Sequence, residues 1–389
     1  MTKLDELIQE YCPDGVEYKR LGDIATISRG GSFQKKDYTE NGVPCIHYGQ
    51  IYMYYGLFAE KTLTYISEEV AQKQKFAEPG DIIMAVTSEN MDDVCKCMAW
   101  LGSKKIAVSG HTAIIHHSIN PKYLVYWLSS TMFYQQKVKI AHGTKVIEVA
   151  PARLADIILP VPPLPVQREI VRILDNFAEL TAELTAELTA RKKQYAYYRD
   201  KLLTMGTEQV AVCNLGDIAD IYTGSKPNEI LDTISDYEYI NAGTGNSGYT
   251  EQPNCEGDTV TTPSRGQGGI GYVGYQSKPF YLGPLCYAIR SKTQEFIINK
   301  YIYHWLVSHS SDILVLKNEG GTPALNKTDL AKIRIKVPPL SVQNRLVEVL
   351  DNFDAICTDL SSGLPAEIEA RQKQYEYYRD KLLSFEEKI

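Results

Sequence analysis

Apolar side chains recur every three or four residues along residues 170–203, with Glu, Arg and Lys on the faces between them. This period predicts an amphipathic helix, and the prolines within residues 160–165 mark its N-terminal limit. Such a helix, if unbroken, is a rod of about 50 Å, because each residue adds about 1.5 Å. A lone rod with one apolar stripe is unstable in water, so the pattern predicts a partner helix. The stripe comprises Ile173, Phe177, Leu180, Leu184, Leu188, Tyr195, Tyr198 and Leu202.

The chain contains this pattern twice. Repeats of such length do not arise by chance, so the second copy of the helix is the natural partner of the first. Each half of the chain has a variable globular part of about 130 residues and a nearly constant tail of about 45 residues. The matching stretches are VPPLPVQ at 161–167 with VPPLSVQ at 337–343, LDNF at 174–177 and 350–353, RKKQYAYYRDKLL at 191–203 with RQKQYEYYRDKLL at 371–383, and LGDIA at 21–25 and 215–219.

The two tails differ in their middle. The first contains the tandem AELTAELTAELTA at 178–190, whereas the second contains SSGLP at 361–365. The insertion in the first tail is four residues, close to one helical turn, so the apolar stripe still faces its partner. Gly and Pro break or kink a helix. We therefore expect one long helix in the first tail and two pieces in the second.

The variable parts have a mixed α and β pattern. Short β-branched and aromatic runs, such as 80–86 and 272–275, alternate with loops rich in Gly, Ser, Asn and Thr. A helix is predicted at 123–136, with a counterpart at 299–311. The fold class is therefore α+β with a pseudo-two-fold internal repeat. The predicted boundaries are 1–158 for an N-terminal domain, 159–206 for a central helical region, 207–335 for a C-terminal domain and 336–389 for a C-terminal helical region.

Composition agrees with a folded chain of two domains, since 44% of the 389 residues are hydrophobic and 23% are charged. Residues 1–10 mix charged with apolar residues and lack the apolar core of a secretory signal. The most apolar stretch, 157–166, is too short and too rich in proline to cross a bilayer. We expect a cytoplasmic protein without a membrane span. The eight cysteines lack the spacing of a zinc site and are predicted to be free thiols.

The net charge of −7 argues against the basic footprint that duplex DNA usually requires. The average conceals a difference between the halves. Lys and Arg outnumber Asp and Glu across 18–150, whereas Asp and Glu are in excess across 211–333. Only the first half is therefore mildly basic.

Two motifs suggest chemistry but lack the necessary context. The sequence GQGGIG at 266–271 fits a GxGxxG loop for a dinucleotide or S-adenosylmethionine, yet no helix is predicted after it to direct its N-terminus at a phosphate. His116 and His117 adjoin on a predicted strand and so point to opposite faces, and we expect no acidic partner near them. His111 and His142 do not complete a metal site with them. We expect neither a catalytic residue nor a metal site in this chain.

Polar loops in both halves place donors and acceptors on irregular backbone, which is the chemistry that base edges and phosphates require. An ordinary solvated loop explains any single residue about as well. The 27 tyrosines could stack on bases, although filling the edges of the core explains most of them. The DNA-binding candidates are Arg29, Ser32, Lys35, Lys36, His47, Tyr48, Gln50, Ser88, Asn90, His142, Thr144 and Lys145 in the first half, and Thr223, Ser225, Lys226, Asn241, Thr244, Asn246, Ser264, Arg265, Gln267 and Thr322 in the second.

With these stretches in view, the chain resembles the specificity subunit of type I restriction-modification systems over its whole length. The resemblance rests on the two PPLxxQ stretches, the two RxKQYxYYRDKLL runs, the AELT tandem and the paired LGDI starts. It implies two target-recognition domains, each reading one part of a split, asymmetric DNA site. It also implies two conserved helical regions that form an antiparallel coiled coil, which sets the spacer and docks two methyltransferase subunits.

The resemblance implies double-stranded DNA, methyltransferase subunits and restriction subunits as partners, and no membrane. S-adenosylmethionine would belong to the methyltransferase subunits, ATP and magnesium to the restriction subunits, and no cofactor to this chain. Two other hypotheses stay open. A self-sufficient DNA enzyme is disfavoured because methyltransferase, ATPase and nuclease motifs are missing. A coiled-coil adaptor without a nucleic-acid role explains the tails, but not why the polar loops of the two halves diverge.

Overall fold

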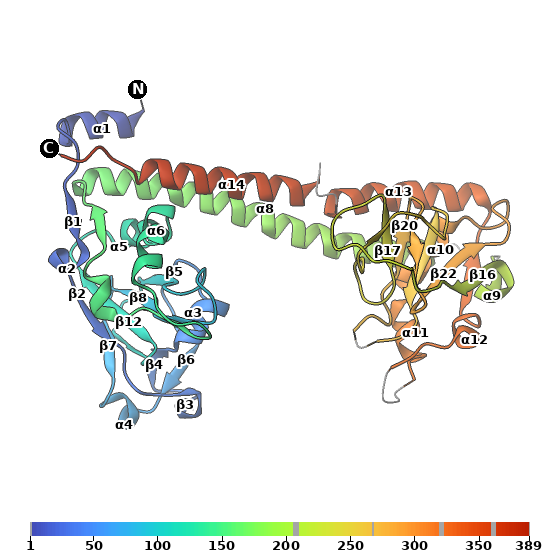
Figure 1. The fold of residues 1–389 in the computed structure, drawn as a ribbon, viewed down its shortest axis with the longest axis horizontal. Helices are drawn as coiled ribbons and strands as arrows, with labels where there is room; N and C mark the ends of the chain where they lie inside the picture. Colours follow the sequence, from blue (N-terminus) through green and yellow to red (C-terminus); the bar gives the residue numbers. More distant parts are fainter. Residues whose placement is uncertain (1, 205–209, 267, 319–322, 359–362, 389) are drawn as a thin grey trace. The chain divides into compact units, whose positions relative to one another are not determined.

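The computed structural model describes residues 2–204, 210–266, 268–318, 323–358 and 363–388. It divides into two compact units, one formed by Met1–Glu183 with Ile368–Ile389 and the other by Leu184–Glu367 (Figure 1). The first unit thus contains the globular part of the first half together with the end of the second tail. The second unit contains the globular part of the second half together with the end of the first tail.

A five-stranded sheet forms the centre of the first unit, in the order β2-β12-β8-β10-β5. Strands β8 and β10 are buried along their whole length, so both faces of the sheet are covered. One face packs on α5, whose Tyr123 and Trp127 belong to the main core. The bounds are β2 (Ala25–Arg29), β12 (Thr112–His117), β8 (Ile82–Ala85), β10 (Cys97–Trp100), β5 (Phe58–Ala59) and α5 (Pro121–Trp127).

The other face of this sheet is covered by α3, a helix that follows strand β4 directly. Ile51 of α3 lies in one apolar cluster with Ile83, Met98 and Trp100 of the sheet. Strand β4 belongs to a second sheet, in the order β3-β6-β4-β11-β7, in which β4 and β11 run parallel. The bounds are α3 (Tyr48–Met53), β3 (Tyr38–Thr39), β6 (Thr64–Ile66), β4 (Val43–Ile46), β11 (Ile106–Val108) and β7 (Lys75–Ala77).

Shorter elements complete the first unit. Strands β1 and β14 pair antiparallel, as do β9 and β13. The bounds are α1 (Lys3–Tyr11), β1 (Tyr18–Arg20), α2 (Leu21–Ile24), η1 (Lys35–Asp37), α4 (Glu68–Ala71), β9 (Thr87–Ser88), α6 (Thr131–Ile140), β13 (Ile147–Glu148), α7 (Pro151–Leu154) and β14 (Ile158–Pro160).

The second unit repeats the same plan. Its main sheet has the order β16-β22-β19-β20, and a smaller sheet, β18-β17-β21, contains a parallel pair, β17 and β21, that matches β4 and β11. The bounds are β15 (Ala211–Asn214), α9 (Leu215–Ile218), β16 (Ala219–Thr223), β17 (Tyr237–Ile240), β18 (Tyr249–Thr250), β19 (Thr259–Pro263), β20 (Gly274–Gln276), β21 (Tyr281–Leu282), β22 (Cys286–Ser291), α10 (Asn299–Ser308), α11 (Ser310–Val315), α12 (Lys327–Leu330) and β23 (Arg334–Val337). The predicted α+β class with an internal repeat is confirmed.

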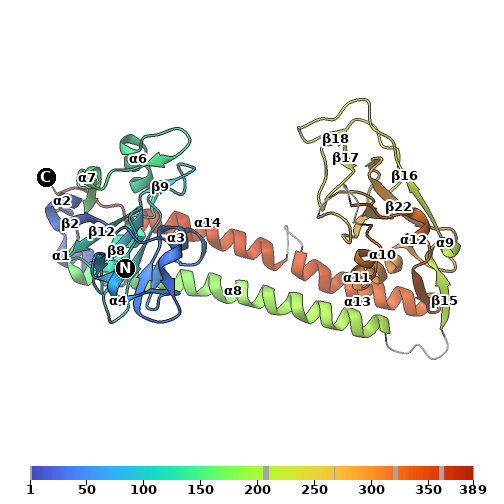
Figure 2. The ribbon, with the colours of Figure 1, turned by 90° about the horizontal axis from the view of Figure 1, so that it is seen from below.

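The first tail is one helix, α8 (Leu164–Thr204), and the second is two, α13 (Leu340–Thr358) and α14 (Leu364–Leu382), as predicted (Figure 2). Helix α8 starts with Pro165 in its first turn, where a missing N–H costs nothing. In the first unit α8 lies against α14, and the rings of Phe177 and Tyr378 stack with centroids 5.5 Å apart. In the second unit α8 lies against α13, with Leu203 and Leu350 in one core.

The repeated end of each tail packs on the globular part of the other half. In the second unit, Asp200 of the first tail accepts a hydrogen bond from the Ser308 hydroxyl at 2.7 Å. In the first unit, Asp380 of the second tail accepts one from the Thr131 backbone N–H at 3.3 Å. Leu383 is fully buried in the core of the first unit. The ends of the two tails are thus exchanged between the halves.

The repeated PPLxxQ stretch is explained by a buried glutamine. The side chain of Gln343 is fully buried and accepts a hydrogen bond from the Ile298 backbone N–H at 3.1 Å. Its amide donates to the carbonyl groups of Pro338 and Phe296 at 2.7 and 2.9 Å. Gln167 makes the matching bonds, from the Asn120 N–H at 2.9 Å and to the Pro162 carbonyl at 2.7 Å. Each glutamine therefore joins the start of a tail helix to the segment that precedes α5 or α10.

Three predictions of secondary structure need comment. The helix predicted at 123–136 is wrong as a single helix, because α5 ends at Trp127 and Ser130 caps a new helix, α6, by accepting from the Phe133 N–H. The counterpart at 299–311 is likewise divided between α10 and α11. The run at 272–275 becomes a strand only from Gly274.

All eight cysteines are free thiols, as expected.

We predict that Gln343→Met lowers the free energy of unfolding by about 2–4 kcal/mol, because buried groups that lose their partners cost about 1–3 kcal/mol each. Urea unfolding followed by tryptophan fluorescence measures the change. Asn344→Met is the matched control, since Asn344 is an exposed neighbour on the same helix. Equal unfolding midpoints for the two variants would contradict the structural role of this glutamine.

Candidate nucleic-acid interface

Three loops of the first unit enclose a recess of about 460 Å³. The first loop follows strand β2, the second follows strand β4, and the third connects strand β11 to strand β12. We call it the basic recess, because Arg29 and Lys35 line it without a carboxylate among the lining residues. The sequence-predicted residues that the structure brings together here are Arg29, Ser32, Lys35, His47 and Tyr48.

Close backbone contacts fix these loops. A side chain at Gly30 would place its Cβ 2.0 Å from the Ser109 carbonyl oxygen, so only glycine permits this approach. The Gly31 N–H donates to the Val108 carbonyl at 2.6 Å. The Tyr48 backbone N–H donates to the Ser109 hydroxyl at 2.9 Å. The recess is thus preformed by backbone geometry, which favours a binding role.

Aromatic rings form one wall of the basic recess. The ring centroids of His47 lie 6.4 Å from Phe33 and 4.5 Å from Tyr48, and Tyr48 lies 4.9 Å from His111. Burial, with smaller effects of Lys35 and His111, lowers the pKa of His47 below its usual value. Its Nδ1 accepts a hydrogen bond from the Gly49 N–H at 3.3 Å, which requires an unprotonated nitrogen. The wall therefore offers ring faces beside Lys35 and Arg29, a combination suited to bases and phosphates. The Arg29 guanidinium is itself held by Glu148 at 3.2 Å and by the Gly110 carbonyl at 2.8 Å, so a phosphate would compete with that carboxylate.

The other candidates of the first half are placed differently. Gln50 is only 7% exposed, and its carbonyl oxygen accepts from the His47 backbone N–H at 2.9 Å, so it supports the recess from inside. Ser88 of β9 pairs with Ile147 of β13, so the 88–90 segment lies beside the loop that contains His142, Thr144 and Lys145. Asn90 accepts from the Asp93 N–H at 2.8 Å and shapes its own turn. Lys36, His142, Thr144 and Lys145 are not among the residues that line the recess.

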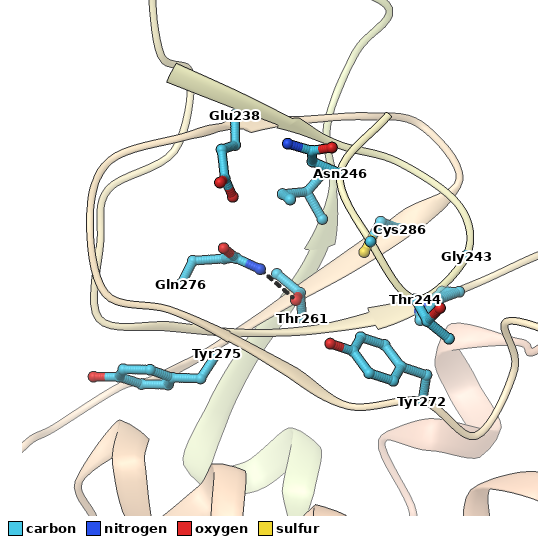
Figure 3. A pocket seen from close by; sticks show the side chains of 12 residues that line it. Glu238, Gly243, Thr244, Asn246, Thr261, Tyr272, Tyr275, Gln276 and Cys286 are labelled. Atoms are coloured by element: carbon cyan, nitrogen blue, oxygen red, sulfur yellow. Dashed lines mark hydrogen bonds between the residues drawn. The ribbon is translucent and has the colours of Figure 1, made fainter. Parts of the chain in front are cut away.

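The second unit has a smaller recess of about 260 Å³ between β17, β19 and β20 and the 243–246 loop (Figure 3). We call it the polar recess. Two sequence-predicted residues, Thr244 and Asn246, line it. Sequence reasoning missed its other polar residues, most of which come from strands: Glu238, Thr261, Tyr275 and Gln276, with Tyr272 from the segment before β20. Because strand residues alternate between faces, only the register of the sheet reveals that these face one cavity.

The remaining candidates of the second half lie outside this recess. Asn241 accepts from the Leu285 N–H at 3.0 Å and holds the neighbouring loop. Thr223 ends strand β16, and Ser225 and Lys226 follow it. The Ser225 hydroxyl lies 3.1 Å from the Tyr281 hydroxyl. Ser264 is buried, and Arg265 forms an isolated bridge with Ala324. Gln267 and Thr322 lie outside the described residues. For all these residues DNA contact stays a prediction.

Two features bear on metals and cofactors. The expectation that no acidic residue lies near His116 is wrong, because Asp81 Oδ1 is 2.6 Å from its Nδ1. Within the described ranges, however, no three His, Cys, Asp or Glu side chains gather as a metal site would. The GxGxxG motif at 266–271 leads into strand β20, so it lacks the helix N-terminus that a nucleotide phosphate needs. That motif does not fit a dinucleotide or S-adenosylmethionine.

Comparisons with known proteins agree with this architecture. A model of the type I restriction modification DNA specificity domain matches residues 13–191 and 207–370. The chain is 37% identical over 253 residues to the type I restriction enzyme EcoR124I/EcoR124II specificity subunit of Escherichia coli, a match that covers 57% of this chain and 60% of that protein. It is 31% identical over 313 residues to the putative specificity subunit S.HindORF215P of Haemophilus influenzae, covering 72% of this chain and 77% of that protein.

Solved structures share the fold. The type I restriction-modification S subunit from M. genitalium has a TM-score of 0.58 at 18% identity, with 95% of this chain and 96% of that chain covered. A chain from a study of type I restriction-modification complex assembly has a TM-score of 0.64 at 16% identity, with 96% and 98% covered. Among the described helices, none combines the length and apolarity that a membrane crossing requires. From its two matched domains, the chain belongs to the type I restriction modification DNA specificity family.

Proposed function

We propose that the chain is the DNA sequence-recognition subunit of a type I restriction-modification complex. Each globular half reads one part of a split, asymmetric site. The coiled coil sets the spacer and docks two methyltransferase subunits, and restriction subunits join this complex. The observation that carries the proposal is that two units with matching central strands contain recesses of different chemistry, whereas the helical tails that join them are nearly constant. Two homologous DNA-recognition domains with different recesses fit a DNA site whose two halves differ in sequence.

The proposal assigns catalysis to the partners. S-adenosylmethionine and adenine methylation belong to the methyltransferase subunits, and ATP and magnesium to the restriction subunits. This chain supplies base contacts and register. Its net charge of −7 is compatible with that role if the partners neutralise much of the phosphate charge around the duplex. On this view the isolated chain binds DNA weakly.

The function is tested by expressing the chain with the methyltransferase encoded beside it and mapping N6-methyladenine in the host DNA by single-molecule sequencing. We expect a split motif that requires both proteins. Methylation of the same motif by the methyltransferase alone would contradict the proposal. A stable complex of the two proteins without any sequence-specific methylation would favour the adaptor hypothesis.

We predict that Arg29→Gln and Lys35→Gln each weaken binding of the assembled complex to its cognate DNA by about 5- to 150-fold, as expected for a lost base or phosphate contact. Fluorescence anisotropy at fixed salt measures the affinity. Lys19→Gln is the control, because Lys19 lies on β1, away from the strands that form the basic recess. Affinities that match this control would exclude the basic recess from the interface.

We also predict that deleting Thr181–Leu184 shortens the unspecified spacer of the recognised site by one or two base pairs. The four residues belong to the uninterrupted helix α8, and removing them shortens it by about 6 Å, against about 3.4 Å per base step. Methylation-motif mapping measures the spacer. Glu183→Gln, which keeps the helix length, is the control. An unchanged spacer in the deletion variant would reject the tail as a ruler.

A further inference from the structure

The polar recess occupies a sheet face that is closed in the first unit. The strand registers show which positions of the two main sheets correspond. In the first unit Ile115 pairs with Ile27 on one side and Ile82 on the other. In the second unit Ile289 pairs in the same way with Ile221 and Val260. One residue further along β8 and β19, Ile83 therefore corresponds to Thr261. Their cross-strand partners, Met98 and Gly274, correspond in turn.

In the first unit this face is apolar and covered. Ile83 and Met98 are fully buried in the cluster that Ile51 of α3 completes. In the second unit the chain after β17 contains Gly243, Gly245 and Gly248 and forms bends in place of a helix. A helix cover, an isoleucine and a methionine are thus replaced by a glycine-rich loop, a threonine and a glycine. These changes together open the polar recess.

The lining of the recess presents hydrogen-bond acceptors. Figure 3 shows the Glu238 carboxylate and the Gln276 carbonyl oxygen directed toward the same space. The Gln276 amide nitrogen donates to the Thr261 hydroxyl at 3.3 Å, which turns its carbonyl oxygen to the recess. The Tyr272 ring lines the same recess, and the Tyr275 hydroxyl is held by Asp258. The recess therefore offers two acceptors next to an aromatic face.

Charge and size restrict what the recess can bind. The described lining residues include a carboxylate and no Lys, Arg or His, so the recess disfavours a phosphate group. Its volume of about 260 Å³ is below the 300–1,000 Å³ typical of pockets for drug-sized ligands, which suits a single base. Carboxylate oxygens accept from the amino group of cytosine, and glutamine pairs with the amino edge of adenine.

We propose that the polar recess is a base-selecting site of the second half, specific for the amino edge of adenine or cytosine, and that Glu238 and Gln276 select it. This inference rests on the proposed function, since it names the bases that one half reads. Such a base can reach the recess either turned out of the duplex or by presenting its edge from within the stack. Both routes use the same acceptors.

The test maps methylation motifs for complexes that contain Glu238→Gln or Gln276→Met. We expect each variant to reduce the preference for adenine or cytosine by about 5- to 150-fold at one position of a single half-site. That half-site is the one that changes when residues 211–333 are exchanged for those of a relative. Glu295→Gln, an exposed carboxylate outside the recess, is the matched control and should leave the motif unchanged. Copurification with the methyltransferase verifies that each variant folds.

The outcomes separate the two proposals. If both folded variants keep the wild-type split motif unaltered, the base-selecting site is overturned and the proposed function stands. A change confined to the other half-site has the same meaning. A wild-type complex without any motif overturns both. Mismatching the partner of the selected base identifies the route: binding tightens if that base leaves the stack, because unpairing then costs less, and does not tighten if it is read within the stack.

Discussion

The structure depends on the contact between each helical tail and the helix of the globular part that it meets, α5 or α10. Tyr126 of α5 donates to Asp175 of α8 at 2.7 Å, and at the matching position Nε2 of His304 in α10 lies 2.8 Å from Asp351 of α13. Tyr123 and Tyr301 donate to the backbone carbonyl groups of Pro160 and Lys336. These polar contacts are partly buried and directional, so they constrain the angle at which a tail leaves its sheet.

The same constraint explains the distribution of constant and variable sequence. Gln167 and Gln343 are buried and bind backbone groups at the start of a tail helix and in the globular part. Such a residue has little freedom to change, because its loss would leave buried backbone groups unpaired. The loops at the far ends of the strands are not constrained in this way. The first unit closes one sheet face with α3 and opens a basic recess beside it, whereas the second opens the face itself. One scaffold thus supports two different binding chemistries.

Charge is distributed in accordance with this division. The basic recess concentrates Arg29 and Lys35 at one place in a chain whose net charge is −7. The polar recess relies on hydrogen-bond acceptors and an aromatic ring in place of cations. Base edges are distinguished by donors and acceptors, whereas phosphates contribute affinity without sequence information. On the proposed function, the chain selects bases within a larger complex and therefore does not need a basic surface of its own.

The sequence by itself determined the duplication, the two amphipathic tails, the break in the second tail and the α+β class, because all of these are encoded in local periodicity and in repeated residues. It also identified five residues of the basic recess, since that recess is built from polar loops. Only the tertiary structure decided which half each tail end packs on, because both ends have the same sequence. It also revealed Glu238 and Gln276 as residues of one cavity. Strand register places them there, and register depends on pairing between segments far apart in the chain.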